Sequence, residues 1–504
     1  MQQALDKRDT TKVSELGVRV IVILYLILGA LYATATPPWQ APDEPAHYNY
    51  VKYIAEHGQL PELQPGDYPY EYLEKIKAAR FPPDLSVDPI RYEFHQPPLY
   101  YMVSSIIYRV NLALFDFPML LVLRGFSLLL GAAALLAGYN VMRAVYPKEP
   151  LLALGAIAFA ATLPMHLTMT ATVNNDVLTG LLLAYIAWRV FAMQADDWTP
   201  RRSFGLGALL GLAFLTKLQS YAAFGIVLFA LAWDTWQTRR GPSYLTWRRA
   251  LGRAGILLGT ALVIASPWLV NNVALYGLTD PLGMARHDAV VTGQLTTAQY
   301  LADYGALALV KAFLQTTFQS FWGQFGWMGV VLPQRVYLPL ALLSGLVVLG
   351  VIVYGWRVLR GDEPLRPATR RGLALLLVWA SLSVMGYLWW NTKYLQHQAR
   401  YLFPALIPWG VAFTLGFRET LQRAFWPALA LLGLGVLATL GVGLATGDIK
   451  GFTLALLLVV AVVLTGARWL EQRRPGAALG LLYSSMAVFS ILCLYIYIVP
   501  ALRP

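Results

Sequence analysis

Long apolar runs alternate with short polar connections along most of this chain of 504 residues. Because the hydrocarbon core of a bilayer gives the backbone no hydrogen-bond partners, runs of this length predict membrane-spanning helices. The alternating pattern of a membrane β-barrel is absent. We therefore expect an all-α polytopic membrane protein with about thirteen transmembrane helices, at residues 16–36, 118–143, 150–170, 173–194, 203–217, 219–237, 251–275, 334–358, 372–390, 400–417, 425–446, 450–467 and 476–499.

Composition supports this class and excludes others. With 57% hydrophobic and only 13% charged residues, the chain has too much apolar surface to bury in soluble cores. Its net charge of +12 arises from Lys and Arg residues at the ends of the apolar runs, as in Arg201-Arg202 and Arg357 to Arg371. The positive-inside rule places these clusters and the N-terminus in the cytoplasm, so nucleic-acid binding is not expected. The single cysteine, Cys493, excludes an internal disulfide and a cysteine metal cluster.

Two polar segments are much longer than the other connections, and both lie on the side opposite the basic clusters. They cover residues 37–117 and 276–333. We expect residues 1–504 to form a single membrane domain, with its functional residues in or beside these two external loops and no soluble domain after the last span. Amphipathic segments in the first loop predict helices that lie on the membrane surface.

An acidic pair, Asp43 and Glu44, follows directly after the first apolar run. The residues from Asp43 to Gly58 predict a short interfacial helix, with Pro45 in its first turn and Gly58 as its end. Carboxylates at a helix N-terminus cap the helix favourably, and this is the structural alternative to a catalytic role. His47 lies on the same face, where it either orients a carboxylate, binds a metal ion or is simply solvated.

The first external loop ends in a second polar group, Glu93, His95 and Gln96, immediately before Pro97-Pro98-Leu99-Tyr100-Tyr101. An amphipathic helix with proline at its start explains the residues from Pro97 onward. It does not explain why two ionisable side chains and an amide precede them. We therefore count Glu93, His95, Gln96 and His47 among the candidates for substrate binding.

Together these motifs resemble the first external loop of the GT-C fold glycosyltransferases, the superfamily of protein O-mannosyltransferases and lipid A aminoarabinose transferases. The matching segments are Asp43-Glu44-Pro45-Ala46-His47-Tyr48 and His95-Gln96-Pro97-Pro98-Leu99-Tyr100-Tyr101. Either segment alone would be a weak signal. Further short segments are similar to a bacterial branch of the superfamily whose substrates are largely unassigned, at residues 173–176, 215–218, 271–277, 320–327 and 398–404.

The resemblance implies that a sugar moves from a polyprenyl-phosphate-linked donor to a lipid, glycan or protein acceptor on the outer face of the plasma or inner membrane. An inverting transfer needs a carboxylate that accepts the proton of the acceptor hydroxyl, and positive charge near the departing phosphate. We expect Asp43 to be the general base. Glu44 is the second candidate for that role, or it orients the acceptor, or it binds a divalent cation such as Mg or Mn together with Asp43. The sequence does not show the further oxygen ligands that such a cation needs.

Basic residues near the outer ends of the spans are the candidates for binding the phosphate: Lys217, Arg400 and, after them, Lys393. Their structural alternative is to extend toward the membrane surface without binding a ligand. Asn174, Asn175 and Asp176 either line the cavity or cap the helix that follows them.

Trp322 and Trp327 belong to an aromatic, glycine-rich segment of the second loop. They either form part of an interfacial aromatic belt, or stack on a sugar or cover the prenyl chain. Two other classes of function remain open. A ligase or polymerase of polyprenyl-linked glycans does not require the acidic pair after the first span. A flippase or transporter of lipid-linked sugars places charges near the bilayer midplane and shows repeats between its halves, and we find no convincing repeat.

Overall fold

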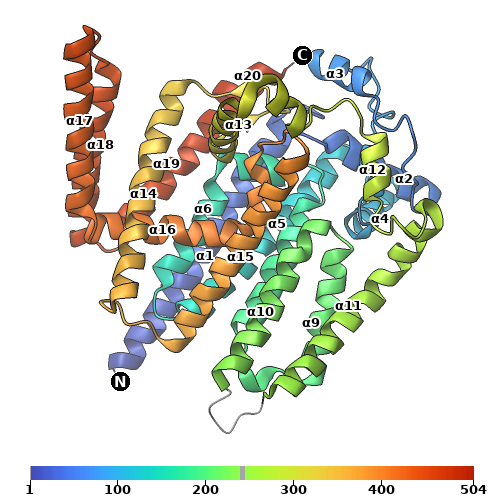
Figure 1. Ribbon diagram of the computed structural model, residues 1–504, viewed down its shortest axis with the longest axis horizontal. Helices are drawn as coiled ribbons and strands as arrows, with labels where there is room; N and C mark the ends of the chain where they lie inside the picture. Colours follow the sequence, from blue (N-terminus) through green and yellow to red (C-terminus); the bar gives the residue numbers. More distant parts are fainter. Residues whose placement is uncertain (1, 239–244, 504) are drawn as a thin grey trace.

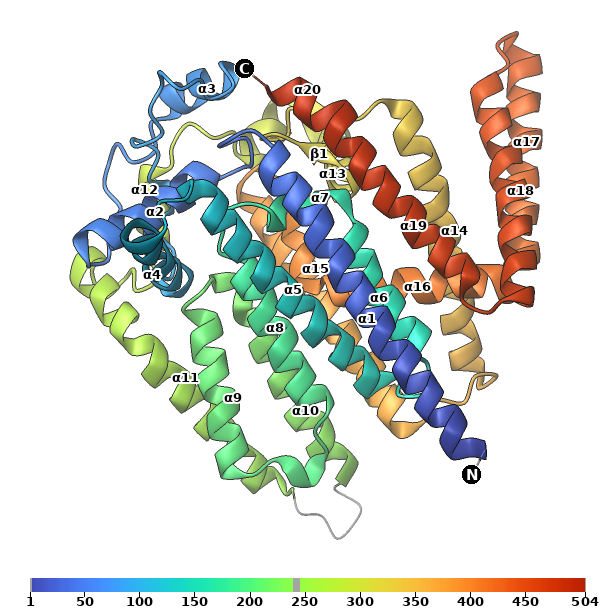
Figure 2. The same ribbon diagram turned by 180° about the vertical axis from the view of Figure 1, so that it is seen from behind.

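The computed structural model describes residues 2–238 and 245–503, and this part of the chain is almost entirely helical. Its two strands, β1 (Gln324–Phe325) and β2 (Val330–Val331), form one small antiparallel hairpin in the second external loop. The prediction of an all-α polytopic membrane protein is confirmed. Figures 1 and 2 show a bundle of long helices with a cap of short helices at one end.

Within the described residues, nine helices are long and apolar enough to cross a membrane. They are α1 (Gln2–Ala35), α5 (Met119–Val145), α10 (Tyr221–Thr238), α11 (Trp247–Tyr276), α14 (Gln334–Arg360), α15 (Pro367–Lys393), α17 (Phe425–Thr446), α18 (Gly451–Arg473) and a last one in which α19 (Ala477–Leu492), η5 (Cys493–Ile498) and α20 (Val499–Leu502) are continuous. A tenth span results if α6 (Pro150–Thr162) and α7 (Pro164–Thr170), which meet at 68°, are counted as one broken helix.

The expected count of thirteen is not confirmed, because three expected spans correspond to shorter helices. They are α8 (Asp176–Phe191), α9 (Pro200–Phe214) and α16 (Leu406–Gln422). At 1.5 Å per residue the 16 residues of α8 extend about 24 Å, less than the hydrocarbon core of about 30 Å. Helix α16 is almost fully buried and crosses the direction of the other helices (Figures 1 and 2).

Small residues let α16 pass through the middle of the bundle. A Cβ atom on Gly350 of α14 would lie 1.9 Å from the carbonyl oxygen of Gly416, and one on Gly410 would lie 2.4 Å from that of Ala156 on α6. Such distances are too short for any side chain, so glycine is required at both crossings. This is the close backbone approach that membrane helices reach through small residues.

Both external loops lie at the end of the bundle that carries the C-terminus, opposite the N-terminus (Figure 1). The first contains α2 (Glu44–His57), α3 (Tyr70–Ala78), the 3₁₀ helix η1 (Tyr92–His95) and α4 (Leu99–Leu114). The second contains α12 (Met284–Val290), α13 (Thr297–Trp322) and the β1–β2 hairpin.

The interfacial helix expected from Asp43 to Gly58 is confirmed as α2. It ends at Gly58 in the left-handed conformation, with φ 71°. Helix α4 exposes an apolar stripe that includes Met102, Ile106 and Val110, while its other face packs on α2 and α5. That amphipathic pattern is typical of a helix at the boundary between water and lipid. The two loops therefore form an outer cap on the membrane bundle.

Candidate active site

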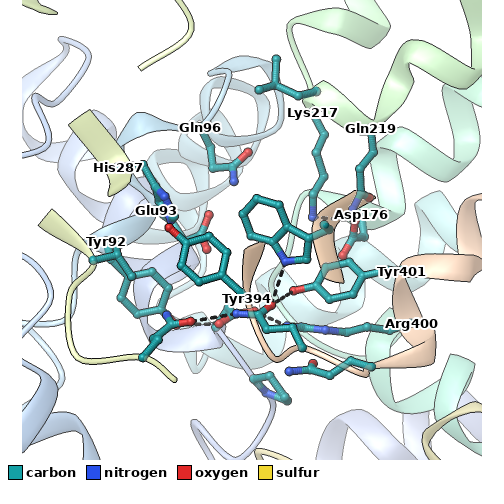
Figure 3. A pocket seen from close by; sticks show the side chains of 18 of the residues that line it. Tyr92, Glu93, Gln96, Asp176, Lys217, Gln219, His287, Tyr394, Arg400 and Tyr401 are labelled. Atoms are coloured by element: carbon teal, nitrogen blue, oxygen red, sulfur yellow. Dashed lines mark hydrogen bonds and ion pairs between the residues drawn. The ribbon is translucent and has the colours of Figure 1, made fainter. Parts of the chain in front are cut away.

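A cavity of about 550 Å³ lies between the outer cap and the ends of the helices. Its wall comes from both external loops, from the start of α8, from the turn between α9 and α10, and from the segment between α15 and α16. Figure 3 shows the polar side chains that point into it. The residues that line the cavity include most of the candidates expected from the sequence: Asp43, His47, Glu93, His95, Gln96, Lys217, Trp327 and Arg400.

Asp43 lies immediately before α2, in the left-handed conformation with φ 67°. This conformation costs a residue other than glycine about 1–2 kcal/mol, although aspartate tolerates it better than most. Its carboxylate lines the cavity and accepts two hydrogen bonds, from the Tyr92 hydroxyl at 2.6 Å and from Arg400 Nη2 at 2.7 Å. Burial by itself would raise the pKa of Asp43, but Arg400, His47 and the Tyr92 hydrogen bond outweigh it and lower this pKa to about 2. Asp43 is therefore ionised at neutral pH.

Both candidate cations for the phosphate line the same cavity. Arg400 pairs with Asp43, and Lys217 Nζ lies 2.7 Å from Oδ1 of Asp176 at the start of α8. Each of the two candidate cations is thus paired with a carboxylate of the same cavity. Arg400 Nε nevertheless has no hydrogen-bond partner in the described part of the chain, so Arg400 retains a donor. Lys393 is exposed and lies 3.8 Å from Asp288, outside the cavity wall.

Glu44 points away from the cavity, in contrast to its neighbour Asp43. Its side chain is 0% exposed and pairs with that of Arg124 on α5, which is 1% exposed. The two carboxylate oxygens lie 2.8 Å and 2.6 Å from Nε and Nη2 of Arg124. Arg124 also donates to the carbonyl oxygens of Ala33 and Thr36 at the end of α1. Glu44 thus ties α1, α2 and α5 together, which corrects the expectation that it shares the site with Asp43.

Glu93 lies in η1 and lines the cavity beside Asp43. Its residue is 9% exposed, and its Oε2 atom has no hydrogen-bond partner among the described residues. Burial, followed by the negative charge of Asp43, raises the pKa of Glu93 to about 8, although Lys217 and Arg400 oppose the shift. Two carboxyl groups in one cavity therefore hold different protonation states at neutral pH.

The histidines of the cavity are held neutral. His47 Nδ1 lies 2.8 Å from the Tyr101 hydroxyl, and burial lowers its pKa to about 3 against the opposing charge of Asp43. His95 Nδ1 lies 2.9 Å from the carbonyl oxygen of Tyr92. Burial and then His287 lower the pKa of His95 well below its usual value. Both rings therefore act as neutral hydrogen-bonding groups.

The residues present do not fit a bound divalent cation. The described residues contain no group of three or more His, Cys, Asp and Glu side chains that could hold a metal ion. Both oxygens of Asp43 already accept hydrogen bonds, and Glu44 faces the opposite way. The joint Asp43–Glu44 metal site for Mg or Mn expected from the sequence therefore has no support in this geometry.

Two solved structures of one protein share the arrangement of helices. ArnT from Cupriavidus metallidurans bound to undecaprenyl phosphate matches with a TM-score of 0.53 and 16% identity, over 95% of this chain and 76% of ArnT. The apo state of ArnT matches with a TM-score of 0.51 and 16% identity, over 96% and 77%. No protein-family model and no curated protein matches the sequence. ArnT is a GT-C glycosyltransferase. This chain has the GT-C fold.

Within this GT-C fold, the remaining candidates separate into lining and supporting residues. Gln96 lines the cavity, and its Oε1 lies 3.4 Å from Nδ2 of Asn175. Asn175 is fully buried, does not line the cavity and also donates to the carbonyl oxygen of Thr216, at 3.2 Å. The alternative that Asn175 lines the cavity is therefore wrong.

The two candidate tryptophans have different positions. Trp327 lines the cavity, stacks on Phe81 with ring centroids 6.0 Å apart, and donates from Nε1 to the carbonyl oxygen of Trp39 at 2.9 Å. Trp322 is 2% exposed and packs against Phe159 in the core, so stacking of Trp322 on a substrate is not supported. Trp327 joins the second external loop to the first and forms part of the cavity wall.

Several lining residues were not among the candidates from the sequence: Tyr92, His287, Trp390, Tyr394 and Tyr401. Tyr92 and Tyr401 each adjoin a candidate, so neighbouring positions carried a usable signal. His287 and Tyr394 lie in stretches without a comparable motif. His287 comes to the site from α12 in the second loop, and Tyr394 comes from the segment between α15 and α16 (Figure 3).

Proposed function

We propose that this chain is a membrane glycosyltransferase that moves a sugar from a polyprenyl-phosphate-linked donor to an acceptor hydroxyl on the extracytoplasmic side, with inversion at the anomeric carbon. The observation that carries the proposal is Asp43, an ionised carboxylate held in the cavity between Tyr92 and Arg400. The shared fold with ArnT, one of whose structures is bound to undecaprenyl phosphate, supports a lipid phosphate as part of the donor.

In this mechanism Asp43 is the general base. The acceptor oxygen attacks the anomeric carbon, the bond from that carbon to the phosphate oxygen breaks, and Asp43 takes the proton of the acceptor hydroxyl. The lipid phosphate leaves with the bonding electrons. Asp43 then releases the proton to water.

The charges around Asp43 suit such a reaction. Arg400 holds one oxygen of Asp43 through Nη2 while its Nε has no partner among the described residues. Because Arg400 lines the cavity, its guanidinium group is placed to attract a phosphate oxygen while it holds the carboxylate. Lys217, across the cavity, adds positive charge where negative charge develops on the leaving phosphate.

The position of the cavity supports an outward-facing site in the cell membrane. The cavity lies under the external loops, whereas the end of α14 with Arg357 and the start of α15 with Arg371 lie at the other end of the bundle (Figure 1). The positive-inside rule makes that other end cytoplasmic. Charged residues gathered at one end, rather than at the midplane, favour a transferase over a transporter.

The test is sugar transfer by the purified protein in nanodiscs, from a panel of polyprenyl-phosphate sugars, read as release of free polyprenyl phosphate. Asp43→Asn is expected to lower the turnover at least about 100-fold, because general base catalysis contributes roughly 10²–10⁴-fold. Asp88→Asn is the matched control, since Asp88 lies in the same loop but pairs with Lys52 on the exposed surface. Equal turnover by Asp43→Asn and native protein, or no turnover of any donor, would overturn the proposal.

A further inference from the structure

Among the described residues that line the cavity, Glu93 is the one carboxyl group without a basic partner. The three cations that line the cavity each pair with a different carboxylate: Arg400 with Asp43, Lys217 with Asp176, and Lys77 with Glu74. Among the described residues, the fourth lining carboxyl group has no ion pair, and its buried Oε2 has no hydrogen-bond partner. A buried polar atom without a partner costs about 1–3 kcal/mol, so it calls for a functional explanation.

The net charge of the cavity bears on the protonation state of Glu93. The three ion pairs cancel, and the histidines that line the wall, His47, His95 and His287, all have lowered pKa values. An ionised Glu93 would therefore give the cavity a net negative charge and repel a phosphate. A neutral Glu93 leaves the cavity uncharged and adds an O–H donor, the group that a phosphate oxygen can accept.

We propose that Glu93 acts as a neutral carboxylic acid whose Oε2–H donates a hydrogen bond to a phosphate oxygen of the lipid-linked donor. This inference rests on the proposed function, which supplies the lipid phosphate. No proton is transferred in this role: Glu93 holds the phosphate, while the proton of the acceptor goes to Asp43. The phosphate is thus bound by two cations that remain paired and by one neutral acid.

The surroundings of Glu93 favour the neutral form at neutral pH. Burial, followed by the negative charge of Asp43, raises the pKa of Glu93. Lys217, Arg400 and a hydrogen bond with Gln96 oppose this rise, and the resulting pKa is about 8. The other ionisable groups that line the same space are Tyr92 and His95 of η1, His47 of α2, Asp176 of α8, His287 of α12, the Glu74–Lys77 pair of α3, and Tyr68, Tyr70, Tyr221, Tyr387, Tyr394 and Tyr401. Above about pH 8 we expect Glu93 to ionise and the affinity for a phosphate to fall.

This role and a role as general base predict opposite behaviour. As a hydrogen-bond donor, Glu93 is active when protonated, so donor binding weakens as the pH rises through about 8. As a base it would be active when ionised, so turnover would rise through the same range. Glutamine at this position is neutral and still donates from its amide, and it therefore replaces the donor but not the base.

The experiment measures the Kd of undecaprenyl phosphate for the full-length protein in phosphatidylcholine nanodiscs between pH 6 and 9.5, with undecaprenol as the ligand that lacks the phosphate. For native protein, Kd is expected to increase about tenfold per pH unit above the pKa of Glu93, since one proton is released. Glu93→Gln is expected to stay within about threefold of native at pH 7 and to lose this alkaline weakening, and Glu93→Ala to bind about tenfold more weakly because the hydrogen bond is lost. The second ionisation of the phosphate near pH 6 affects every variant alike.

Glu56→Gln is the matched control, because Glu56 is exposed on α2 of the same loop. Binding of undecaprenol is expected to be the same for all variants and at each pH. The inference is overturned if Glu93→Gln retains the alkaline weakening, or binds as weakly as Glu93→Ala. If lipid phosphate binds in this way but no donor is turned over, the proposed reaction fails while the role of Glu93 in binding stands. If turnover depends on Asp43 but Glu93→Gln binds undecaprenyl phosphate as weakly as Glu93→Ala, the proposed reaction stands and the role of Glu93 in binding fails.

Discussion

Two buried Arg–Asp ion pairs lie at opposite ends of the bundle. They contain the same residue types, but they differ in whether every hydrogen-bonding atom of the arginine has a partner. At the end of the bundle that carries the N-terminus, Arg371 on α15 holds Asp234 on α10 by two contacts of 2.7 Å and 2.8 Å. Trp198 donates to the same carboxylate, and Arg371 also donates to the carbonyl oxygen of Val190. At the outer end, Arg400 holds Asp43 through one nitrogen, with Nε unpartnered within the described structure.

This difference distinguishes a pair that stabilises the fold from a pair that belongs to the candidate active site. The hydrogen bonds of the Arg371–Asp234 pair join α15 to α10 and to the end of α8, and α10 to Trp198, and neither residue lines the cavity. The Arg400–Asp43 pair faces 550 Å³ of open space beside a second unpartnered atom, Oε2 of Glu93. Buried polar groups are normally satisfied, so two ionisable side chains of one cavity that each keep an unsatisfied atom call for an explanation. A buried ion pair by itself indicates neither stability nor function.

The Glu44–Arg124 pair belongs with the structural class, and its removal is expected to have the largest effect on folding. Glu44→Gln leaves the guanidinium of Arg124 buried with a neutral partner. Breaking one side of a buried pair costs about 3–5 kcal/mol of unfolding free energy. We expect a strongly lowered melting temperature and yield in detergent, whereas the exposed Glu56→Gln leaves both unchanged. A Glu44→Gln protein as stable as native would contradict the structural assignment.

Replacing each arginine by lysine sharpens the comparison between the two ends. Lysine keeps the charge but loses the planar fork of donors. Arg371→Lys is expected to cost about 1–3 kcal/mol of unfolding free energy, because buried carbonyl and carboxylate oxygens lose partners, with donor affinity unchanged. Arg400→Lys is expected to leave stability within about 1 kcal/mol and to weaken the binding of undecaprenyl phosphate about tenfold. Thermal unfolding measures the change in stability, and a lipid-binding assay measures the change in affinity, for both variants. If both variants lost the same stability, or the same affinity, the distinction between a structural pair and a binding pair would be wrong.

The same pair predicts how the pH profile depends on Arg400. Asp43 has a folded-state pKa of about 2, below its usual value of 3.8, so its ionised form persists until the pH falls toward 2. Turnover of native protein is therefore expected to show no acid limb above pH 4. Arg400→Gln removes the leading cause of the lowered pKa, and the opposing effect of burial then moves the acid limb upward into the range of pH 4–6, roughly. Turnover profiles from pH 4 to 7 check this, and a flat profile in Arg400→Gln would contradict it.

Sequence patterns predicted the elements and the residues of the site better than they predicted the pairings. Hydropathy identified the membrane helices because lipid exposure selects long apolar runs, but it does not measure tilt or burial, so α16 resembled a span. The acidic pair was read as one unit, yet the left-handed backbone of Asp43 directs the two carboxylates to different neighbours. Partners such as Arg124, 80 positions from Glu44, leave no local trace in the sequence.

The two tryptophans of the second loop give the smallest expected effects and the most direct test of where the site ends. Trp327→Phe removes the hydrogen bond to the carbonyl oxygen of Trp39, worth about 1 kcal/mol, and loosens the cavity wall where the two loops meet. We expect KM for the donor to rise a few-fold, with a small change in melting temperature. Trp322→Phe creates a void in the core against Phe159 and is expected to lower stability while KM stays unchanged. A rise in KM for Trp322→Phe without loss of stability would place Trp322, rather than Trp327, at the wall of the site.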